Sequence, residues 1–141
     1  MEISAVKRRV QQGLATARTR AQERRQQTDG ATRDYAVFLE TVATPLVQQL
    51  ANVLKVEGYA FTASTPGDTV RLTNDRGRGD FVELALDTSG ERPQVVGRIT
   101  QSRGSRRLDE EQPIKAGALP SELTDEDLLE FLMQALERWL V

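Results

Sequence analysis

Residues 59–102 read YAFTASTPGDTVRLTNDRGRGDFVELALDTSGERPQVVGRITQS, and this stretch decides the fold. Within residues 81–87 (FVELALD), apolar and mostly polar side chains alternate, as they do in a strand with one buried face. Proline, glycine and aspartate cluster between such segments and mark turns. The stretch therefore predicts four antiparallel strands: Tyr59–Thr65, Thr69–Asn74, Phe81–Asp87 and Gln94–Ser102.

A fifth, short strand is expected near Leu108 or Ile114. Pro113 restricts such a strand to a sheet edge, because proline has no backbone N–H for an inner ladder. A sheet with one apolar face also needs helices to cover that face. The sequence thus predicts an α+β fold, an antiparallel four- to five-stranded meander covered on one face by helices, in the order α-α-β-β-β-β-α.

Two helices are expected before the sheet, at residues 2–27 and at about 33–56. Gly30, in the polar segment 28–32, is expected to end the first helix, since glycine is frequent at helix C-termini. The second helix carries the stronger apolar stripe and is interpreted as the main core helix. Pro45 lies inside it and predicts a kink or two abutting helices, with Thr44 capping the second.

The C-terminal segment predicts one more helix, strongly apolar and largely buried. Thr124 is the expected N-cap, and Leu123 and Leu128 fit a hydrophobic staple across the first turn. The pattern extends this helix to the final residue. The domain organisation that follows is a basic N-terminal helix or arm at 1–28 and a single α+β domain at 29–141.

The stripe of the N-terminal helix is thin, and this suggests an interface. Its strongest members are spaced three and four residues apart: Ile3, Val6, Val10 and Leu14. So narrow a stripe suits packing along another helix, including a second copy of the same helix. These four residues are the candidate oligomer interface.

Charge is distributed unevenly along the chain, although the net charge is only −2. Residues 1–33 hold eight basic and three acidic side chains, which gives +5, and residues 108–141 hold two basic and nine acidic ones, which gives −7. Residues 34–107 hold nine of each and balance. The two ends are therefore expected to attract each other, within or between chains, or the basic end meets an external polyanion.

The candidate anion-binding residues are arginines in two regions. In the N-terminal helix they are Arg8, Arg9, Arg18, Arg20, Arg24 and Arg25, and after the third strand they are Arg98, Arg103, Arg106 and Arg107. Arg76 and Arg78 join the second group if the loops lie close. The alternative for both groups is a solvated charged surface that protects helix faces and sheet edges.

The chain has no cysteine and no histidine, which removes thiolate sites, the commonest general base and the usual partner of a serine nucleophile. We therefore expect no enzyme activity, no catalytic residues, no metal site and no cofactor. The absence of a signal-peptide pattern or an apolar span favours a cytoplasmic protein that is not held in a membrane.

The expected function is a non-catalytic protein–protein interaction or assembly module, homo-oligomeric, whose partner is the chain itself, as a homodimer, or another protein. One alternative is electrostatic binding of nucleic acid or another polyanion through the basic N-terminal helix. Another is a small-ligand binder with a pocket between the sheet and the helices.

Overall fold

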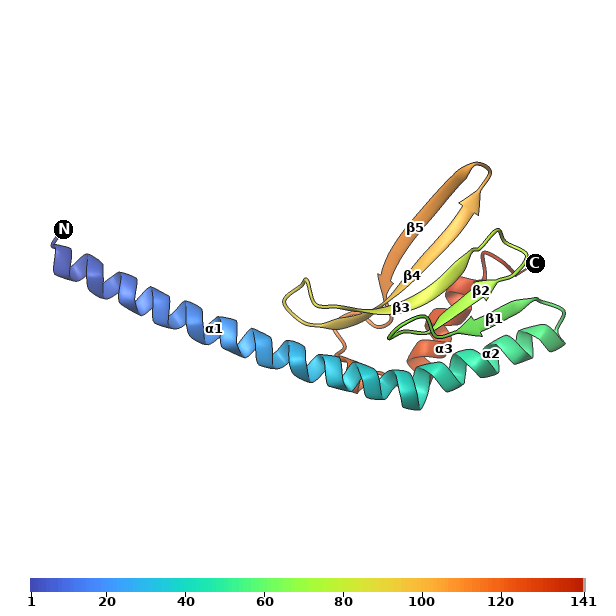
Figure 1. Cartoon of the computed structure of the whole chain (residues 1–141), viewed down its shortest axis with the longest axis horizontal. Coiled ribbons are helices and arrows are strands. Elements are labelled where there is room, and N and C mark those ends of the chain that lie inside the picture. Colours follow the sequence, from blue (N-terminus) through green and yellow to red (C-terminus); the bar gives the residue numbers. More distant parts are fainter. Residues whose placement is uncertain (141) are drawn as a thin grey trace. The chain divides into compact units, whose positions relative to one another are not determined.

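The computed structural model of the chain describes residues 1–140 and divides into two compact units, Met1–Gly30 and the chain from Ala31 onward. The first unit is helical from Ile3, and the second holds a five-stranded sheet with helices before and after it (Figure 1). The elements in order are α1 (Ile3–Phe38), the π-helical segment η1 (Leu39–Ala43), α2 (Thr44–Val56), β1 (Phe61–Ser64), β2 (Arg71–Asn74), β3 (Phe81–Asp87), β4 (Gln94–Arg103), β5 (Arg106–Pro113), the 3₁₀ turn η2 (Pro120–Glu122) and α3 (Asp125–Leu136).

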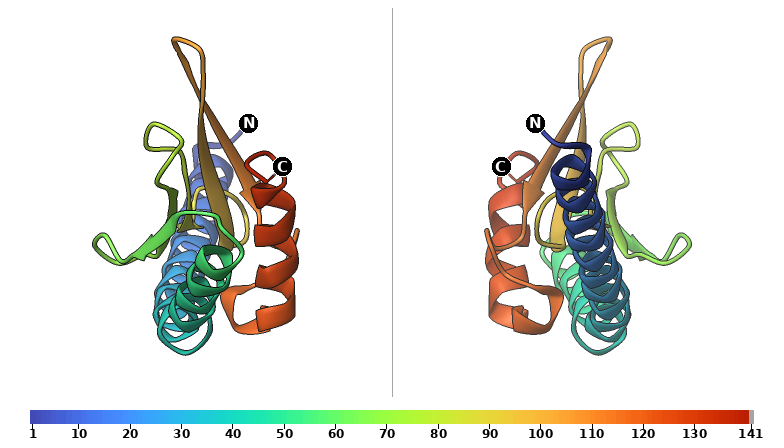
Figure 2. Two further views of the ribbon diagram at one scale, coloured as in Figure 1. Left: turned by 90° about the vertical axis from the view of Figure 1, so that its right-hand side faces the viewer. Right: turned by 90° about the vertical axis from the view of Figure 1, so that its left-hand side faces the viewer.

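The sheet is an antiparallel meander in the order β1-β2-β3-β4-β5, and helices α2 and α3 lie against its apolar face (Figure 2). This confirms the predicted α+β fold. The fifth strand also exists, and β5, which ends at Pro113, forms an edge of the sheet beside β4. The third strand has the predicted bounds, whereas β1 and β2 are shorter than predicted and β4 is one residue longer.

One row of side chains across the sheet illustrates how the core is built. Leu72, Val82 and Ile99 stand in register on β2, β3 and β4, and each is at most 2 % exposed. They belong to a single apolar cluster with side chains of α2 and α3. Burial of each such side chain contributes about 1.5–3 kcal/mol, so this face holds the second unit together.

The predicted break at residues 28–32 is wrong, because α1 continues through this segment to Phe38. A glycine inside a helix costs only about 1 kcal/mol relative to alanine, and this is a weak preference that tertiary packing overrides. Ala31, Tyr35 and Phe38 follow directly and are buried at helical spacing. Their burial requires helical backbone immediately after Gly30, so the helix does not end there.

The helix changes direction instead at η1, just before Pro45 (Figure 1). Proline cannot donate a backbone hydrogen bond, and its ring clashes with the carbonyl four residues earlier, here that of Thr41. A wider π-helical turn absorbs this conflict and leaves two abutting helices. The predicted capping role of Thr44 is wrong, since Ala43 holds the cap position in helical conformation and no side chain caps the end.

Helix α3 begins as predicted, with a reciprocal capping box: the Asp127 N–H donates to Thr124 Oγ1 and the Thr124 N–H donates to Asp127 Oδ2, both at 3.1 Å. The prediction that the helix continues to the end of the chain is wrong, because α3 ends at Leu136. Beyond it the Trp139 indole Nε1–H donates to Asp80 Oδ2 at 3.1 Å. This tertiary bond holds the segment after α3 in a turn.

Candidate functional site

The apolar stripe of the N-terminal unit lies on exposed helix. The exposed fractions are 87 % for Ile3, 44 % for Val6, 53 % for Val10 and 50 % for Leu14. By contrast, the part of α1 that belongs to the second unit has three buried residues, Ala31, Tyr35 and Phe38, which lie in or next to the apolar core. The candidate interface residues are therefore uncovered in the single chain.

The six candidate arginines of the N-terminal unit are also exposed. In the described residues none of them takes part in an ion pair, and Arg25 donates only to the Ala21 carbonyl of its own helix, at 3.4 Å. They lie around the helix rather than on one face, because Arg8, Arg9 and Lys7 are consecutive. Their charge is thus available to an external group.

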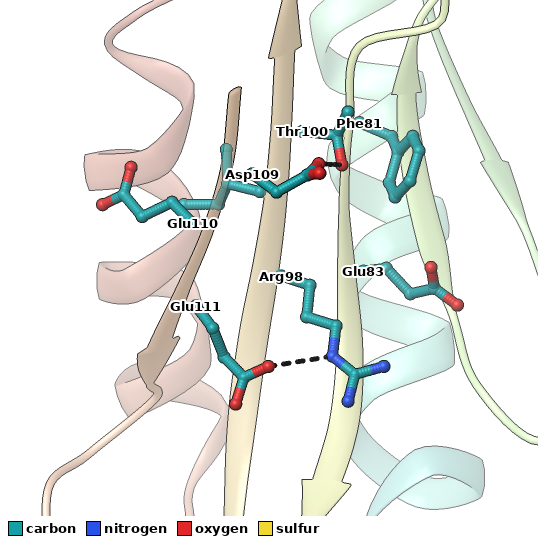
Figure 3. A pocket seen from close by; sticks show the side chains of 8 residues that line it. Phe81, Glu83, Arg98, Thr100, Asp109, Glu110 and Glu111 are labelled. Atoms are coloured by element: carbon teal, nitrogen blue, oxygen red, sulfur yellow. Dashed lines mark hydrogen bonds and ion pairs between the residues drawn. The ribbon is translucent and has the colours of Figure 1, made fainter. Parts of the chain in front are cut away.

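A row of alternating charges crosses the face of the sheet opposite the core. Arg71 of β2, Glu83 of β3, Arg98 of β4 and Glu111 of β5 are partners in register. The Arg71 Nη2 to Glu83 Oε2 distance is 2.9 Å. The Arg98 Nε to Glu111 Oε2 distance is 3.0 Å, and Figure 3 shows this second ion pair. Opposite charges directly across neighbouring strands stabilise a sheet. Arg98 is therefore partnered by a carboxylate, unlike the other arginines of its predicted group.

Beside this row lies a shallow hollow of about 220 Å³ between β3, β4 and β5 (Figure 3). Thr100 Oγ1 donates to Asp109 Oδ1 at 2.8 Å within it. The Phe81 ring at its border is flanked by two guanidinium groups, Arg71 at 4.1 Å and Arg107 at 5.9 Å from the ring centroid. The polar groups of this hollow are paired: Arg98 with Glu111 and Thr100 with Asp109 inside it, and Glu83 with Arg71 and Glu110 with Arg138 beside it.

The remaining arginines gather at the end of the β4–β5 hairpin. Arg103 and Arg106 are cross-strand partners on either side of the turn that contains Gly104. Arg78, from the loop between β2 and β3, reaches this turn and donates from Nη1 to the Gly104 carbonyl at 3.3 Å. The two loops therefore do lie close, and we call this cluster the arginine tip: Arg78, Arg103, Arg106 and Arg107.

Asp80 fixes the base of the hairpin, a role that nothing in the sequence indicates beyond a polar residue next to a strand. Its side chain is only 5 % exposed. Its Oδ1 accepts from the Ser102 N–H at 2.8 Å, and its Oδ2 accepts from Trp139. One buried carboxylate thus joins β4, the loop before β3 and the segment after α3.

A second, more apolar pocket of about 510 Å³ lies where the end of α1 and η1 face the β1–β2 loop. Tyr35, Leu39 and Thr69 are among its lining residues. The Tyr35 hydroxyl lies 3.5 Å from Thr69 Oγ1, and burial raises the pKa of Tyr35, an effect that the Thr69 hydrogen bond partly offsets. The π-helical turn before Pro45 shapes this pocket, and Pro45 is the signal in the sequence that points to it.

Within residues 1–140, no three carboxylates gather closely enough to hold a metal ion. In the same part of the chain, no helix has both the length and the apolar character of a membrane span. Comparison with known proteins found no matching family model, no matching curated protein and no matching solved structure.

Proposed function

We propose that this chain is a non-catalytic assembly module that forms a homodimer through the N-terminal helix. The observation that carries the proposal is the exposure of Ile3, Val6, Val10 and Leu14 along one helix face. Single helices are marginally stable in water, and most helical stability in proteins comes from packing of an apolar face. A second helix on this stripe supplies that packing.

Charge complementarity favours a second copy as the partner. Glu126, Glu130 and Glu137 are exposed, and their spacing of four and seven places them on one face of α3 and its end. Within the described residues none of the three forms an ion pair. In a two-fold dimer, each surface is present twice and can meet its complement on the other chain. The acidic face then offsets the repulsion between two basic helices.

Replacing Val6 and Val10 with aspartate tests the proposal directly. The double variant V6D/V10D places charge in the stripe and should lower the mass measured by light scattering from twice the chain mass of 15.7 kDa to that mass. The matched control is Q12D/T16D, which makes the same charge change at the same spacing on the opposite side of the helix. The proposal fails if the unmodified chain is a monomer or if both variants behave alike.

The second candidate function is polyanion binding through the same basic helix. The absence of ion pairs to its arginines, within residues 1–140, is the observation that favours it. Such binding is sequence-independent and weakens steeply with salt. A variant with Arg18, Arg20 and Arg24 replaced by alanine that loses nucleic-acid binding while it keeps the dimer mass would favour this alternative.

A further inference from the structure

The β4–β5 hairpin extends beyond the rest of the sheet (Figures 1 and 2). Pairing between β3 and β4 ends at Phe81 and Thr100, whereas pairing between β4 and β5 continues to Arg103 and Arg106. The last residues of the hairpin therefore form a two-stranded ribbon that carries the arginine tip.

The arginine tip is an uncompensated positive surface. Within residues 1–140 none of its four members forms an ion pair. The carboxylates next to it in sequence accept hydrogen bonds from other groups, Asp80 from Ser102 and Trp139, and Asp109 from Thr100, and neither forms an ion pair with the tip within these residues. Like charges directly opposite across two strands, as at Arg103 and Arg106, destabilise a hairpin. A bound anion removes that repulsion.

The backbone around the tip brings Arg78 to the end of the hairpin. Arg78 adopts a left-handed conformation with φ of 53°, which costs a residue with a side chain about 1 kcal/mol. This turn lets the Arg78 guanidinium reach the Gly104 carbonyl of the hairpin. Asp80 ties the same loop to Ser102 at the base of the ribbon. Arg78 therefore lies beside the turn that Arg103 and Arg106 flank, and the arginines of the two loops share one part of the surface.

We propose that the arginine tip binds the phosphate backbone of double-stranded nucleic acid. Guanidinium groups present paired donors that match phosphate oxygens. A two-stranded ribbon fits the B-DNA major groove, which is about 12 Å wide. Single strands are bound mainly by stacking bases on exposed aromatic rings, and the Phe81 ring near the tip is flanked by Arg71 and Arg107. The ribbon therefore suits a duplex better than a single strand.

The test uses the full chain and fluorescence anisotropy with labelled duplexes of about 20 base pairs, one of DNA and one of RNA, titrated between about 50 and 200 mM salt. The variant R103A/R106A/R107A should bind roughly a hundredfold more weakly near 0.1 M salt, with a slope of log affinity against log salt reduced by about 0.9 for each arginine. The matched control is K55A/R92A/K115A, which removes the same charge from elsewhere in the second unit and should retain the original slope.

A loss that is larger on DNA than on RNA supports insertion into the B-form groove, and equal losses support contact with phosphates alone. The inference is overturned if neither duplex binds at about 50 mM salt, or if the tip variant and the control lose affinity equally. It is also overturned if only anionic vesicles bind through the tip, or if only the N-terminal arginines affect duplex binding. None of these outcomes depends on whether the chain dimerises, because mass is measured separately for each variant.

Discussion

Gly97 shows how one residue decides the packing of two elements. It faces the core from β4, opposite Leu84, and the Phe131 ring of α3 occupies the space that a side chain there would fill. A Cβ on Gly97 would lie 2.2 Å from Phe131 Cζ, far below any normal contact distance. The glycine is therefore required by the close approach of α3, not by its backbone conformation.

Replacing Gly97 with alanine should lower the free energy of unfolding by about 1–3 kcal/mol, because the ring must move in a packed core. Denaturant unfolding followed by circular dichroism measures the change. The control is Gly90→Ala, since the nearest atom to a Cβ there is 4.0 Å away. Adding Phe131→Leu to Gly97→Ala should recover part of the loss, and a Gly97→Ala variant as stable as Gly90→Ala would contradict this account of the packing.

At the scale of elements, the helices show which helix-breaking residues of the sequence interrupt a helix in the folded chain. Gly30 and Pro45 are both helix breakers in sequence, yet only the second interrupts the helix. Glycine weakens a helix by an amount that burial of Ala31 and Tyr35 readily exceeds. Proline removes a donor and introduces a clash, about 3 kcal/mol or more, which packing does not cancel. Whether a helix breaker interrupts a helix therefore depends on the size of its free-energy cost, and not only on its presence in the sequence.

The capping box of α3 yields a prediction at this scale. Thr124→Ala removes the hydroxyl that accepts from the Asp127 N–H and should lower the free energy of unfolding by about 1 kcal/mol. Thr88→Ala makes the same chemical change in an exposed loop and should have little effect. Urea unfolding curves at neutral pH compare the two, and equal midpoints would show that the cap contributes nothing measurable.

The same cap makes the stability of the fold depend on pH in the acid range. The hydrogen bond from the Thr124 N–H, helped by its hydroxyl and by Lys115, lowers the pKa of Asp127 below its usual value of 3.8. A carboxyl with a lowered pKa in the folded state stabilises the fold above its unfolded pKa, and this contribution is lost as pH falls below 3.8 through the folded value. The difference between the unmodified chain and Asp127→Asn should therefore shrink below that pH.

For the whole molecule, the separation of charge is the main feature. The first 33 residues carry +5 and the last 34 carry −7, and within residues 1–140 no ion pair joins the two regions. The cross-strand charge row, where opposite charges meet in register, takes Arg71, Glu83 and Arg98 from the balanced middle and Glu111 from the acidic C-terminal region. The unpaired charge at the two ends is thus left for contacts between molecules.

Reversing charge on α3 tests this view of assembly. The variant E126K/E130K should weaken the proposed dimer, because a basic α3 repels the basic N-terminal helix of the partner. The control E40K/E57K makes the same charge change at exposed sites outside α3 and should leave the dimerisation constant nearly unchanged. Sedimentation at several concentrations measures both, and equal effects would indicate a general influence of net charge.

The sequence by itself determined the class of the fold and most of its elements. Strand alternation predicted the meander, Pro113 predicted the edge position of the fifth strand, and Thr124 predicted the start of α3. These features depend on local periodicity and capping, which involve residues near each other in the chain. The same local patterns predicted the candidate interface residues and the candidate anion-binding arginines. They did not predict which of these arginines lie together in the folded chain.

Only the tertiary structure decided where α1 and α3 end and which charged side chains meet. The continuation of α1 past Gly30 and the end of α3 at Leu136 depend on burial and on the bond between Trp139 and Asp80. The strand register pairs Arg98 with Glu111 and leaves Arg103, Arg106 and Arg107 together near the end of the hairpin. A hydrogen bond from Arg78 to the Gly104 carbonyl brings a fourth arginine to this cluster. The bonds from Arg98 to Glu111, from Arg78 to Gly104 and from Trp139 to Asp80 join residues 13, 26 and 59 positions apart, and no periodic pattern in the sequence encodes such pairs.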